Sequence, residues 1–292
     1  MENLLQETKM IMNKNNIRAN KSLGQNFLIN KEVVEEIIES SNINKEDLII
    51  EIGPGLGTLT KYLLEKAGKV ICVELDNKMI KILQDRFFLY DNLEIINQDI
   101  LKVDLDKIIK NEKEKGKIKK AKIVANLPYY ITTPIIMKLL EEKLDLESIT
   151  VMIQKEVADR LIACPGDKET GAITYAVYYY AKAKGIMEVP KNSFIPAPEV
   201  TSKVINLKLR KEPEVKVRNE KLMFEIIKSA FMQRRKTLLN ALTNAKVFIN
   251  KEEGMHILEK LGLDINIRAE KLSLENFADI TNMLIINYKS QQ

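Results

Sequence analysis

The sequence predicts an α/β protein in which a parallel sheet covered by helices precedes a small all-helical domain. Short β-rich runs alternate with segments of helical spacing over the first half of the chain, and this alternation is typical of a parallel sheet. After about residue 210 the apolar residues recur at helical spacing alone. A length of 292 residues suits about two domains. We therefore expect a first domain over residues 1–210 and a second over residues 211–292.

Short apolar runs predict the strands of the first domain. They lie at residues 48–52, 70–73, 93–96, 123–125 and 150–153. The first two runs lead into segments of helical spacing at residues 58–67 and 75–87. Between the third and fourth runs, residues 107–122 carry eight Lys against two Glu. That composition favours a solvated loop or a frayed helix.

Capping signals divide the second domain into helices. Residues 219–245 have the spacing of one long helix. Asn250 and Glu253 form a capping-box pattern that opens the next helix, and Gly262 is its stop signal. Ser273 is a candidate cap for the last helix.

The composition excludes several classes of protein. Apolar residues make up 45% of the chain, which excludes disorder over most of its length. Two cysteines and one histidine are too few for a disulfide scaffold, a multi-histidine metal site or a histidine-based triad, so we expect no metal. No apolar run approaches the roughly 20 residues that cross a bilayer, and the N-terminus lacks the layout of a signal peptide. We expect a cytoplasmic protein with no membrane partner.

A glycine cluster at residues 51–57 follows the first predicted strand and indicates a cofactor site. Its spacing is E-x-G-x-G-x-G, which differs from a dinucleotide fingerprint and lacks the lysine of a P-loop. Gly53 and Gly55 let the backbone pass close to a ligand. Glu74 ends the second strand and can accept hydrogen bonds from two ribose hydroxyls, and Asp99 follows the third and can accept from an adenine amino group. A glycine cluster alone is a tight turn, but this combination resembles the S-adenosyl-L-methionine (SAM) site of Rossmann-like class I methyltransferases.

The fourth strand runs into Asn126-Leu127-Pro128-Tyr129, a motif suited to an adenine substrate. The exocyclic amine of adenine is a poor nucleophile because its lone pair is delocalised into the ring. Acceptors for its protons, from the Asn126 side chain and a backbone carbonyl at Leu127 or Pro128, would direct that lone pair toward a methyl donor. Tyr129 offers a face on which a base can stack.

Motifs along the chain resemble those of the KsgA/RsmA family of small-subunit rRNA adenine N6,N6-dimethyltransferases. The segments that carry this likeness lie at residues 21–28, 154–161, 165–168, 194–202 and 231–238, beside the glycine and acceptor motifs. The resemblance implicates Asn26 and Leu28 in cofactor contact and Phe194 as a second stacking face. It implies methyl transfer from SAM to N6 of two adjacent adenines near the 3′ end of 16S rRNA, with a role in small-subunit maturation. The segment at residues 107–122 is long for the family.

Basic residues concentrate where the second domain begins. Residues 203–246 hold twelve Lys or Arg against four Glu, a local charge of +8 in a chain of net charge +5. A single lysine there suits a solvated helix face, whereas Arg234, Arg235 and Lys236 together indicate RNA binding. We expect a monomer that binds 16S rRNA in the immature small subunit.

Other functions remain open from the sequence. An Erm-type 23S rRNA adenine N6-methyltransferase shares the catalytic motifs, although the segments at residues 194–202 and 231–238 look more like KsgA. A ribosome-assembly factor would bind immature subunits with methylation as a secondary role. A DNA adenine methyltransferase would more often carry Asp at the position of Asn126, and a small-molecule enzyme would not need a basic helical domain.

Overall fold

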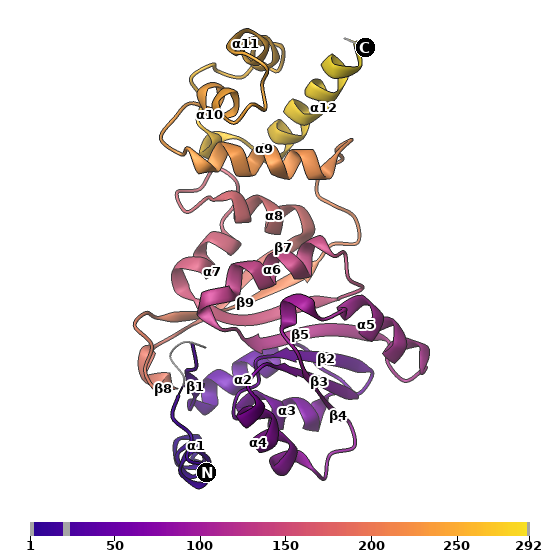
Figure 1. Cartoon of the computed structure of the whole chain (residues 1–292), viewed down its shortest axis with the longest axis vertical. Helices are drawn as coiled ribbons and strands as arrows, with labels where there is room; N and C mark the ends of the chain where they lie inside the picture. Colours follow the sequence, from indigo (N-terminus) through magenta and orange to yellow (C-terminus); the bar gives the residue numbers. More distant parts are fainter. Residues whose placement is uncertain (1–2, 20–23, 291–292) are drawn as a thin grey trace. The chain divides into compact units, whose positions relative to one another are not determined.

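The computed structural model describes residues 3–19 and 24–290, and the chain forms two compact units (Figure 1). The first unit holds the chain up to residue 158 together with residues 183–209. The second holds residues 159–182 and the chain from residue 210 onward. The expected boundary at residue 210 thus coincides with one crossing between the units, while residues 159–182 group with the C-terminal helices. The long motif at residues 21–28 begins with three residues, Lys21, Ser22 and Leu23, that lie outside the described ranges.

A seven-stranded sheet in the order β4-β3-β2-β5-β6-β9-β7 carries the first unit. Its strands are β2 (Asp47–Ile52), β3 (Lys69–Glu74), β4 (Leu93–Asn97), β5 (Lys120–Asn126), β6 (Ser148–Gln154), β7 (Ala181–Val189) and β9 (Ser202–Leu209). β2 to β6 pair in parallel and confirm the five predicted strands. β9 was not predicted, and it pairs antiparallel to β6. A second, two-stranded sheet joins β1 (Phe27–Leu28) to β8 (Phe194–Ile195).

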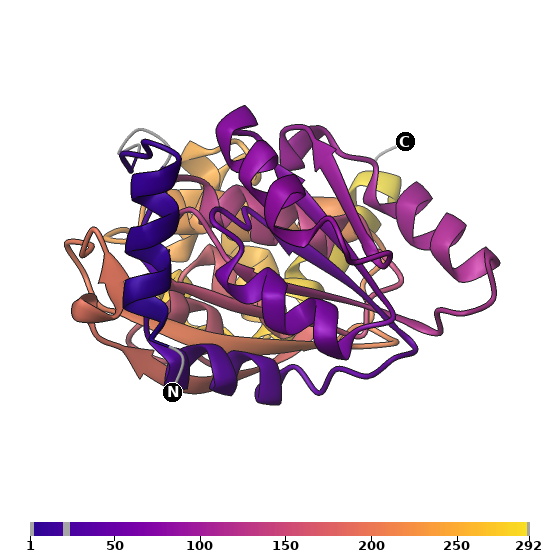
Figure 2. The ribbon, with the colours of Figure 1, turned by 90° about the horizontal axis from the view of Figure 1, so that it is seen from below.

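Helices cover both faces of the larger sheet (Figure 1). They are α2 (Lys31–Ser40), α3 (Thr58–Lys66) and α4 (Asn77–Phe87) on one face, with α5 (Leu105–Glu114) and α6 (Thr132–Glu141) on the other. The first three share a core with residues of the strands, among them Ile49, Val70, Cys72, Val124 and Met152. The indigo helix in Figure 2 is α1 (Leu4–Lys14), which contributes Leu4 to that core and Ile11 to a second, smaller apolar cluster. Short 3-10 helices are η2 (Ile100–Lys102), η3 (Tyr129–Ile131), η4 (Lys191–Ser193) and η5 (Ala269–Lys271).

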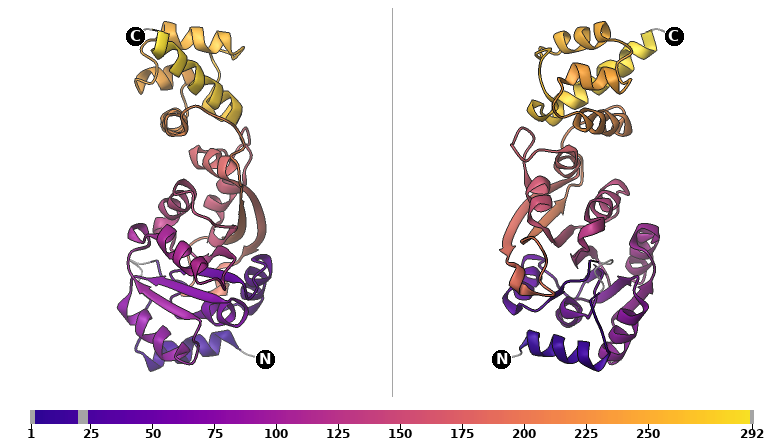
Figure 3. Two further views of the ribbon diagram at one scale, coloured as in Figure 1. Left: turned by 90° about the vertical axis from the view of Figure 1, so that its right-hand side faces the viewer. Right: turned by 60° about the vertical axis from the view of Figure 1, so that its left-hand side comes forward.

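The second unit is helical apart from the strand residues it shares with the sheet, and its C-terminal helices are the orange to yellow ribbons in Figure 3. Its helices are the end of α7 (Lys155–Ile162), α8 (Ala172–Tyr180), α9 (Glu220–Met232), α10 (Leu238–Asn244), α11 (Lys251–Lys260) and α12 (Leu274–Ser290). The predicted caps are confirmed, because Asn250 accepts from the Glu253 N–H and Ser273 from the Asn276 N–H. Across the described ranges, no helix is both long and apolar enough to span a membrane.

The single long helix predicted over residues 219–245 is wrong. α9 ends at Met232, where Gln233 leaves the helical region with φ −123° and ψ 49°. The chain re-enters a helix at Thr237, whose hydroxyl caps α10 by accepting from the Asn240 N–H. Leu238 donates its N–H to the carbonyl of Ile267 instead of continuing the helix. No glycine or proline marks this break, so helical spacing alone reads through it.

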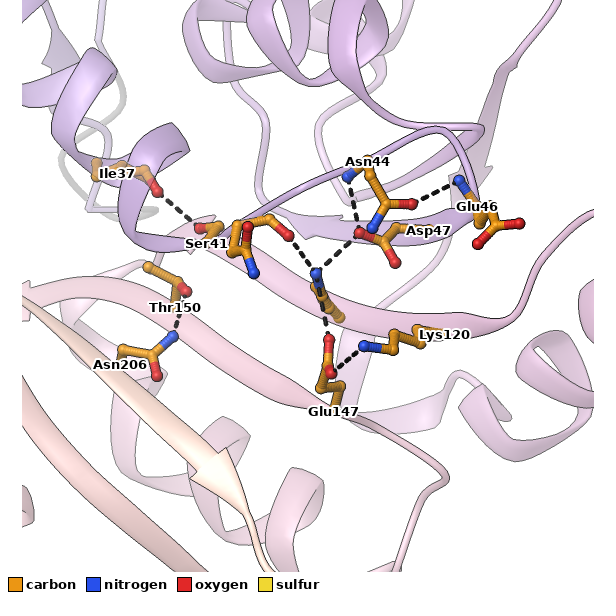
Figure 4. A network of polar contacts seen from close by, with 11 residues as sticks. Ile37, Ser41, Asn44, Glu46, Asp47, Lys120, Glu147, Thr150 and Asn206 are labelled. Atoms are coloured by element: carbon orange, nitrogen blue, oxygen red, sulfur yellow. Dashed lines mark hydrogen bonds and ion pairs between the residues drawn. The ribbon is translucent and has the colours of Figure 1, made fainter.

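The lysine-rich segment at residues 107–122 is only partly the solvated loop or frayed helix that its composition favours. α5 takes residues 107–114, a short turn follows at residues 115–119, and residues 120–122 begin β5, where Lys122 is 2% exposed. The Lys122 ammonium donates to Asp47 Oδ2 at 2.8 Å and to the Asn42 carbonyl at 2.6 Å, and pairs with Glu147 at 3.2 Å. Asp47 is fully buried, and its Oδ1 has no partner in the described part of the chain. Figure 4 shows Asp47 and Glu147 converging from two strand beginnings, so this ion-pair cluster joins β2, β5 and β6.

We expect Lys122→Met to lower the free energy of unfolding by about 3–5 kcal/mol, because it leaves the buried Asp47 carboxylate without a counter-ion. Lys120→Met is the matched control. Lys120 lies on the same strand and pairs with Glu147, but its side chain is 52% exposed, so its loss should cost at most about 1 kcal/mol. Urea denaturation measures both. Equal effects of the two substitutions would show that the buried pair does not hold these strands together.

Candidate active site at the carboxyl edge of the sheet

A pocket of about 220 Å³ opens at the carboxyl ends of β2, β3 and β5. The strand order reverses there, since the chain runs from β2 outward to β4 and then returns to β5 on the other side. Such a switch point leaves a crevice that no crossover helix fills. The structure brings together at this pocket most of the residues that the sequence indicated: Asn26, Leu28, Gly53, Gly55, Glu74, Asp99, Asn126, Leu127, Pro128 and Tyr129.

The glycine loop between β2 and α3 needs glycine for two different reasons. Gly55 has φ +57°, and a Cβ there would lie 3.4 Å from the ring of Phe27. Gly57 begins α3 with φ +81°, and a Cβ there would lie 2.6 Å from the ring of Phe87. Side chains at these positions would have to adopt an unfavourable backbone conformation or displace a packed aromatic ring. The loop therefore presents bare backbone to the pocket.

Glu74 is fixed at the end of β3 by backbone groups. Its Oε1 accepts from the N–H groups of Leu75 and Asp76 at 2.8 and 2.9 Å, and its Oε2 accepts from the Gly55 N–H at 3.2 Å. Burial raises the pKa of this carboxyl, and these hydrogen bonds oppose the rise. A carboxylate offers about four acceptor positions, so Glu74 orders the glycine loop and keeps capacity for a ligand hydroxyl.

Two apolar side chains that the sequence did not indicate line the pocket beside the two acidic residues. Leu75 follows Glu74 and is 52% exposed, and Leu101 lies close to Asp99 and is 38% exposed. The Asp99 side chain caps η2 by accepting from the Leu101 N–H at 3.0 Å. The signal in the sequence was an apolar residue close behind an acidic one at a strand end. Together these groups suit a flat base with a polar rim.

Asn126 is held in one orientation by the N-terminal segment. Its amide nitrogen donates to the backbone carbonyl of Asn26 at 3.3 Å, while the Asn26 side chain donates to the Gly24 carbonyl at 3.1 Å. Since the NH₂ group is committed to a carbonyl, Oδ1 of Asn126 is the atom left to accept a hydrogen bond. Asn126 ends β5 and lines the pocket.

The residues after Asn126 pack against the glycine loop. A Cβ at Gly53 would lie 3.7 Å from Pro128. The Pro128 carbonyl already accepts from the Thr132 hydroxyl and the Ile131 N–H, which makes the Leu127 carbonyl the better acceptor for a substrate. The Tyr129 hydroxyl bonds to that of Ser202 on β9, and burial raises the pKa of this phenol.

Phe194 is a predicted site residue that the structure does not bring to the pocket. It lies in β8 opposite Leu28 of β1 and is 2% exposed. Its ring belongs to the core on one face of the sheet, with Val189 and Val204. Leaving that core to stack on a base would cost roughly 1.5–3 kcal/mol of lost burial. In this structure Phe194 is a core residue, and its stacking on a base stays a prediction.

The three basic residues predicted to bind RNA have different surroundings in the second unit. Arg234 donates to the Thr170 carbonyl at 2.9 Å and pairs with Glu270 at 3.9 Å. Arg235 and Lys236 are exposed, and their side chains pair with no residue in the described ranges. Arg234 therefore has a structural role of its own, whereas Arg235 and Lys236 are available to a ligand.

Glu51 is a buried carboxyl at the pocket whose state the sequence did not reveal. It is 2% exposed and lies on β2, directly before the glycine loop. Its Oε2 accepts from the Thr60 hydroxyl at 2.6 Å and faces the Cys72 thiol at 3.5 Å. Burial raises its pKa from 4.5 to about 7, although the bond from Thr60 opposes the rise. Glu51 thus ties β2 to α3 and changes charge near neutral pH.

Residues 16–285 match the protein family described as ribosomal RNA adenine dimethylase. A protein of Alkaliphilus metalliredigens (strain QYMF), named ribosomal RNA small subunit methyltransferase A, is 48% identical over 275 residues. These cover 94% of this chain and 95% of that protein. A protein of the same name from Lachnoclostridium phytofermentans is 49% identical over 280 residues, covering 95% and 96% of the two chains.

Two solved structures share the architecture. The crystal structure of a dimethyladenosine transferase from Plasmodium falciparum has a TM-score of 0.74 at 27% identity and covers 90% of this chain and 98% of its own. The 23S rRNA methyltransferase ErmE has a TM-score of 0.66 at 21% identity, covering 89% and 100%. The second likeness shows a common fold alone.

Relative to wild type, Glu51→Gln should be more stabilising at pH 8 than at pH 5. The raised pKa means that the fold favours the protonated carboxyl, so its contribution to stability is complete below about pH 4.5 and is lost as the pH rises through 7. Glutamine cannot ionise, so the unfolding free energy of the variant relative to wild type should rise by about 2–3 kcal/mol over this interval. Urea denaturation at both pH values measures it, with the exposed Glu39→Gln as control. A difference that does not change with pH would contradict the assignment.

Proposed function

The chain belongs to the ribosomal RNA adenine dimethylase family, and on that premise we propose that it methylates N6 of two adjacent adenines near the 3′ end of 16S rRNA. The methyl donor is SAM and the product is N6,N6-dimethyladenosine. The proposed substrate is the immature small ribosomal subunit in the cytoplasm, and the proposed active form is a monomer. Relatives at 48–49% identity named for the small subunit support this choice over the large subunit.

The residues at the pocket fit SAM. The buried carboxylate of Glu74 suits the ribose hydroxyls, since oxygen acceptors at the end of the second strand of such sheets face the sugar. Asp99 and the apolar side chains of Leu75 and Leu101 suit an adenine ring with an amino group at its rim. When bound, SAM supplies a methyl group on a positively charged sulfur, which is electrophilic without further activation.

The orientation of Asn126 is the observation that carries the proposal. Because its NH₂ group donates to the Asn26 carbonyl, its Oδ1 faces a donor such as the adenine amino group. The Leu127 carbonyl is the second acceptor. Two acceptors hold the amine so that its lone pair points at the methyl carbon. With SAM bound at this edge, the amine so held would take the methyl carbon from the sulfonium, whose sulfur would keep the bonding electrons, and the displaced amine proton would go to solvent.

A neutral acceptor also suits a substrate that is used twice. After the first transfer, one N–H remains on the substrate nitrogen, and the methylated amine must turn to present its lone pair again. An amide oxygen that loses its donor costs less than a buried carboxylate would. We propose that Tyr129, whose hydroxyl is tied to Ser202, supplies the face on which the flipped base stacks.

Incubation of the protein and SAM with immature small subunits should yield dimethyladenosine in 16S rRNA, measured by mass spectrometry of the nucleosides. Large subunits serve as the alternative substrate. Asn126→Ala should slow both transfers by about 10²–10³-fold, the scale for loss of one preorganised polar group, and still bind RNA. Dimethyladenosine in 23S rRNA alone would favour the Erm-type activity instead. An Asn126→Ala variant with near-normal single-turnover rates would remove Asn126 from the mechanism.

The exposed basic pair in the second unit should contact rRNA phosphates. Replacing Arg235 and Lys236 by Ala should reduce the slope of log affinity against log salt by roughly 2 units, while the affinity for SAM stays unchanged. Arg234→Ala is the comparison, since Arg234 is bound to Thr170 and Glu270. It should lower the free energy of unfolding. Its effect on the slope should be smaller than that of the Arg235 and Lys236 replacements. Filter binding over a salt series measures the slope, and an unaltered slope in the double variant would make the pair a solvated surface.

A further inference from the structure

An arginine outside the pocket braces the glycine loop. Arg86 on α4 donates a hydrogen bond from Nη1 to the backbone carbonyl of Leu56, which stands between two glycines of the loop. Its guanidinium lies 5.0 Å from the ring centre of Phe87, and that ring packs against Gly57. Arg86 is not among the residues that line the pocket. It therefore contacts the loop from the side that a ligand does not occupy.

The same guanidinium connects the loop to the N-terminal helix. Nη2 of Arg86 pairs with Oε1 of Glu7 on α1 at 2.5 Å. The two side chains are 18% and 26% exposed, so the pair is largely shielded from water. Burial lowers the pKa of Arg86, and the Glu7 carboxylate opposes that shift. The ion pair compensates a cost that burial imposes on the arginine.

An apolar cluster joins the same two parts of the chain. It consists of Ile11, Ile17, Phe27, Leu56, Met79 and Ile82, and it is separate from the main core. Leu56 is the contribution of the glycine loop and is 1% exposed. Phe27 packs against Gly55 with its ring and lines the pocket. One polar and one apolar connection thus run from α1 to the loop.

These connections matter because the loop is rich in glycine. Glycine loses more conformational freedom on ordering than any other residue, so an unsupported loop would have to be ordered by the cofactor when it binds. A loop that is already held in place spares the ligand that cost, which raises affinity without any new contact. α1 supplies part of this support from residues 4–14, which precede the region matched by the family.

We propose that Arg86 is a positioning residue for the cofactor loop and that, through it, α1 and cofactor binding stabilise each other. The inference rests on the use of SAM in the proposed function. Coupling between two sites is reciprocal. If α1 strengthens cofactor binding, bound cofactor must therefore lower the equilibrium constant for the opening of α1 by the same factor.

The test uses S-adenosylhomocysteine as the probe and no RNA. Calorimetry should show affinity reduced about 10–100-fold in Arg86→Met, the effect expected for loss of a charged hydrogen bond, and about 3–10-fold in Glu7→Gln. Arg86→Lys keeps the charge but cannot serve both partners, so it should fall between wild type and Arg86→Met. Lys81→Met, an exposed cation on the same helix, should match wild type. Circular dichroism checks that each variant is folded.

Hydrogen exchange separates this role from a merely structural one. In wild type, saturating S-adenosylhomocysteine should slow exchange of the α1 amides, and in Glu7→Gln that protection should shrink by the same factor as the affinity. Unchanged affinity in both variants, or α1 exchange that does not respond to the ligand, would overturn the proposal. A wild-type chain that binds no S-adenosylhomocysteine would instead contradict the proposed function, so the two failures are distinguishable.

Discussion

The site depends on one topological constraint, which is that the parallel strands end at the same edge of the sheet and their order reverses between β2 and β5. Three residues far apart in the sequence, Glu51, Glu74 and Asn126, reach one crevice because each lies at or near the end of such a strand. No contact between their side chains is needed to bring them there. The hydrogen-bonded ladder sets their positions, and burial of both faces of the sheet fixes its register.

The parallel strands could be predicted because each is an apolar run bounded by polar segments. The two strands that follow β6 in the sheet, β9 and the edge strand β7, could not. β7 begins Ala-Lys-Ala-Lys and includes Gly185, so its pattern is too polar for a buried strand, and only its partners in the fold make it one. The same holds for the break between α9 and α10, since the bond from Leu238 to Ile267 joins residues 29 positions apart. Long-range partners override local spacing in both places.

Side chains follow the same rule as the strands: those in local motifs could be predicted, and those whose partners are distant in the sequence could not. Residues in motifs at strand ends reach the pocket as expected. Lys122 appeared to be a solvated charge because its neighbours in the sequence are charged, but its counter-ion Asp47 lies 75 positions away. Arg86 likewise contacts Glu7 at a separation of 79 positions. Phe194 lies in a motif of the family, yet its burial depends on pairing with β1, which no local pattern reports.

The bond from Asn126 to the Asn26 carbonyl has a consequence for how the enzyme can diverge. An aspartate in this place would set a carboxylate against a carbonyl oxygen, with no N–H between them. A descendant that adopts Asp here must first rebuild the turn at residues 24–26, because the backbone of that turn selects an amide. The choice of a neutral acceptor is therefore imposed by a segment 100 positions upstream. Drift in the N-terminal turn is the event that would open this enzyme to a different acceptor chemistry.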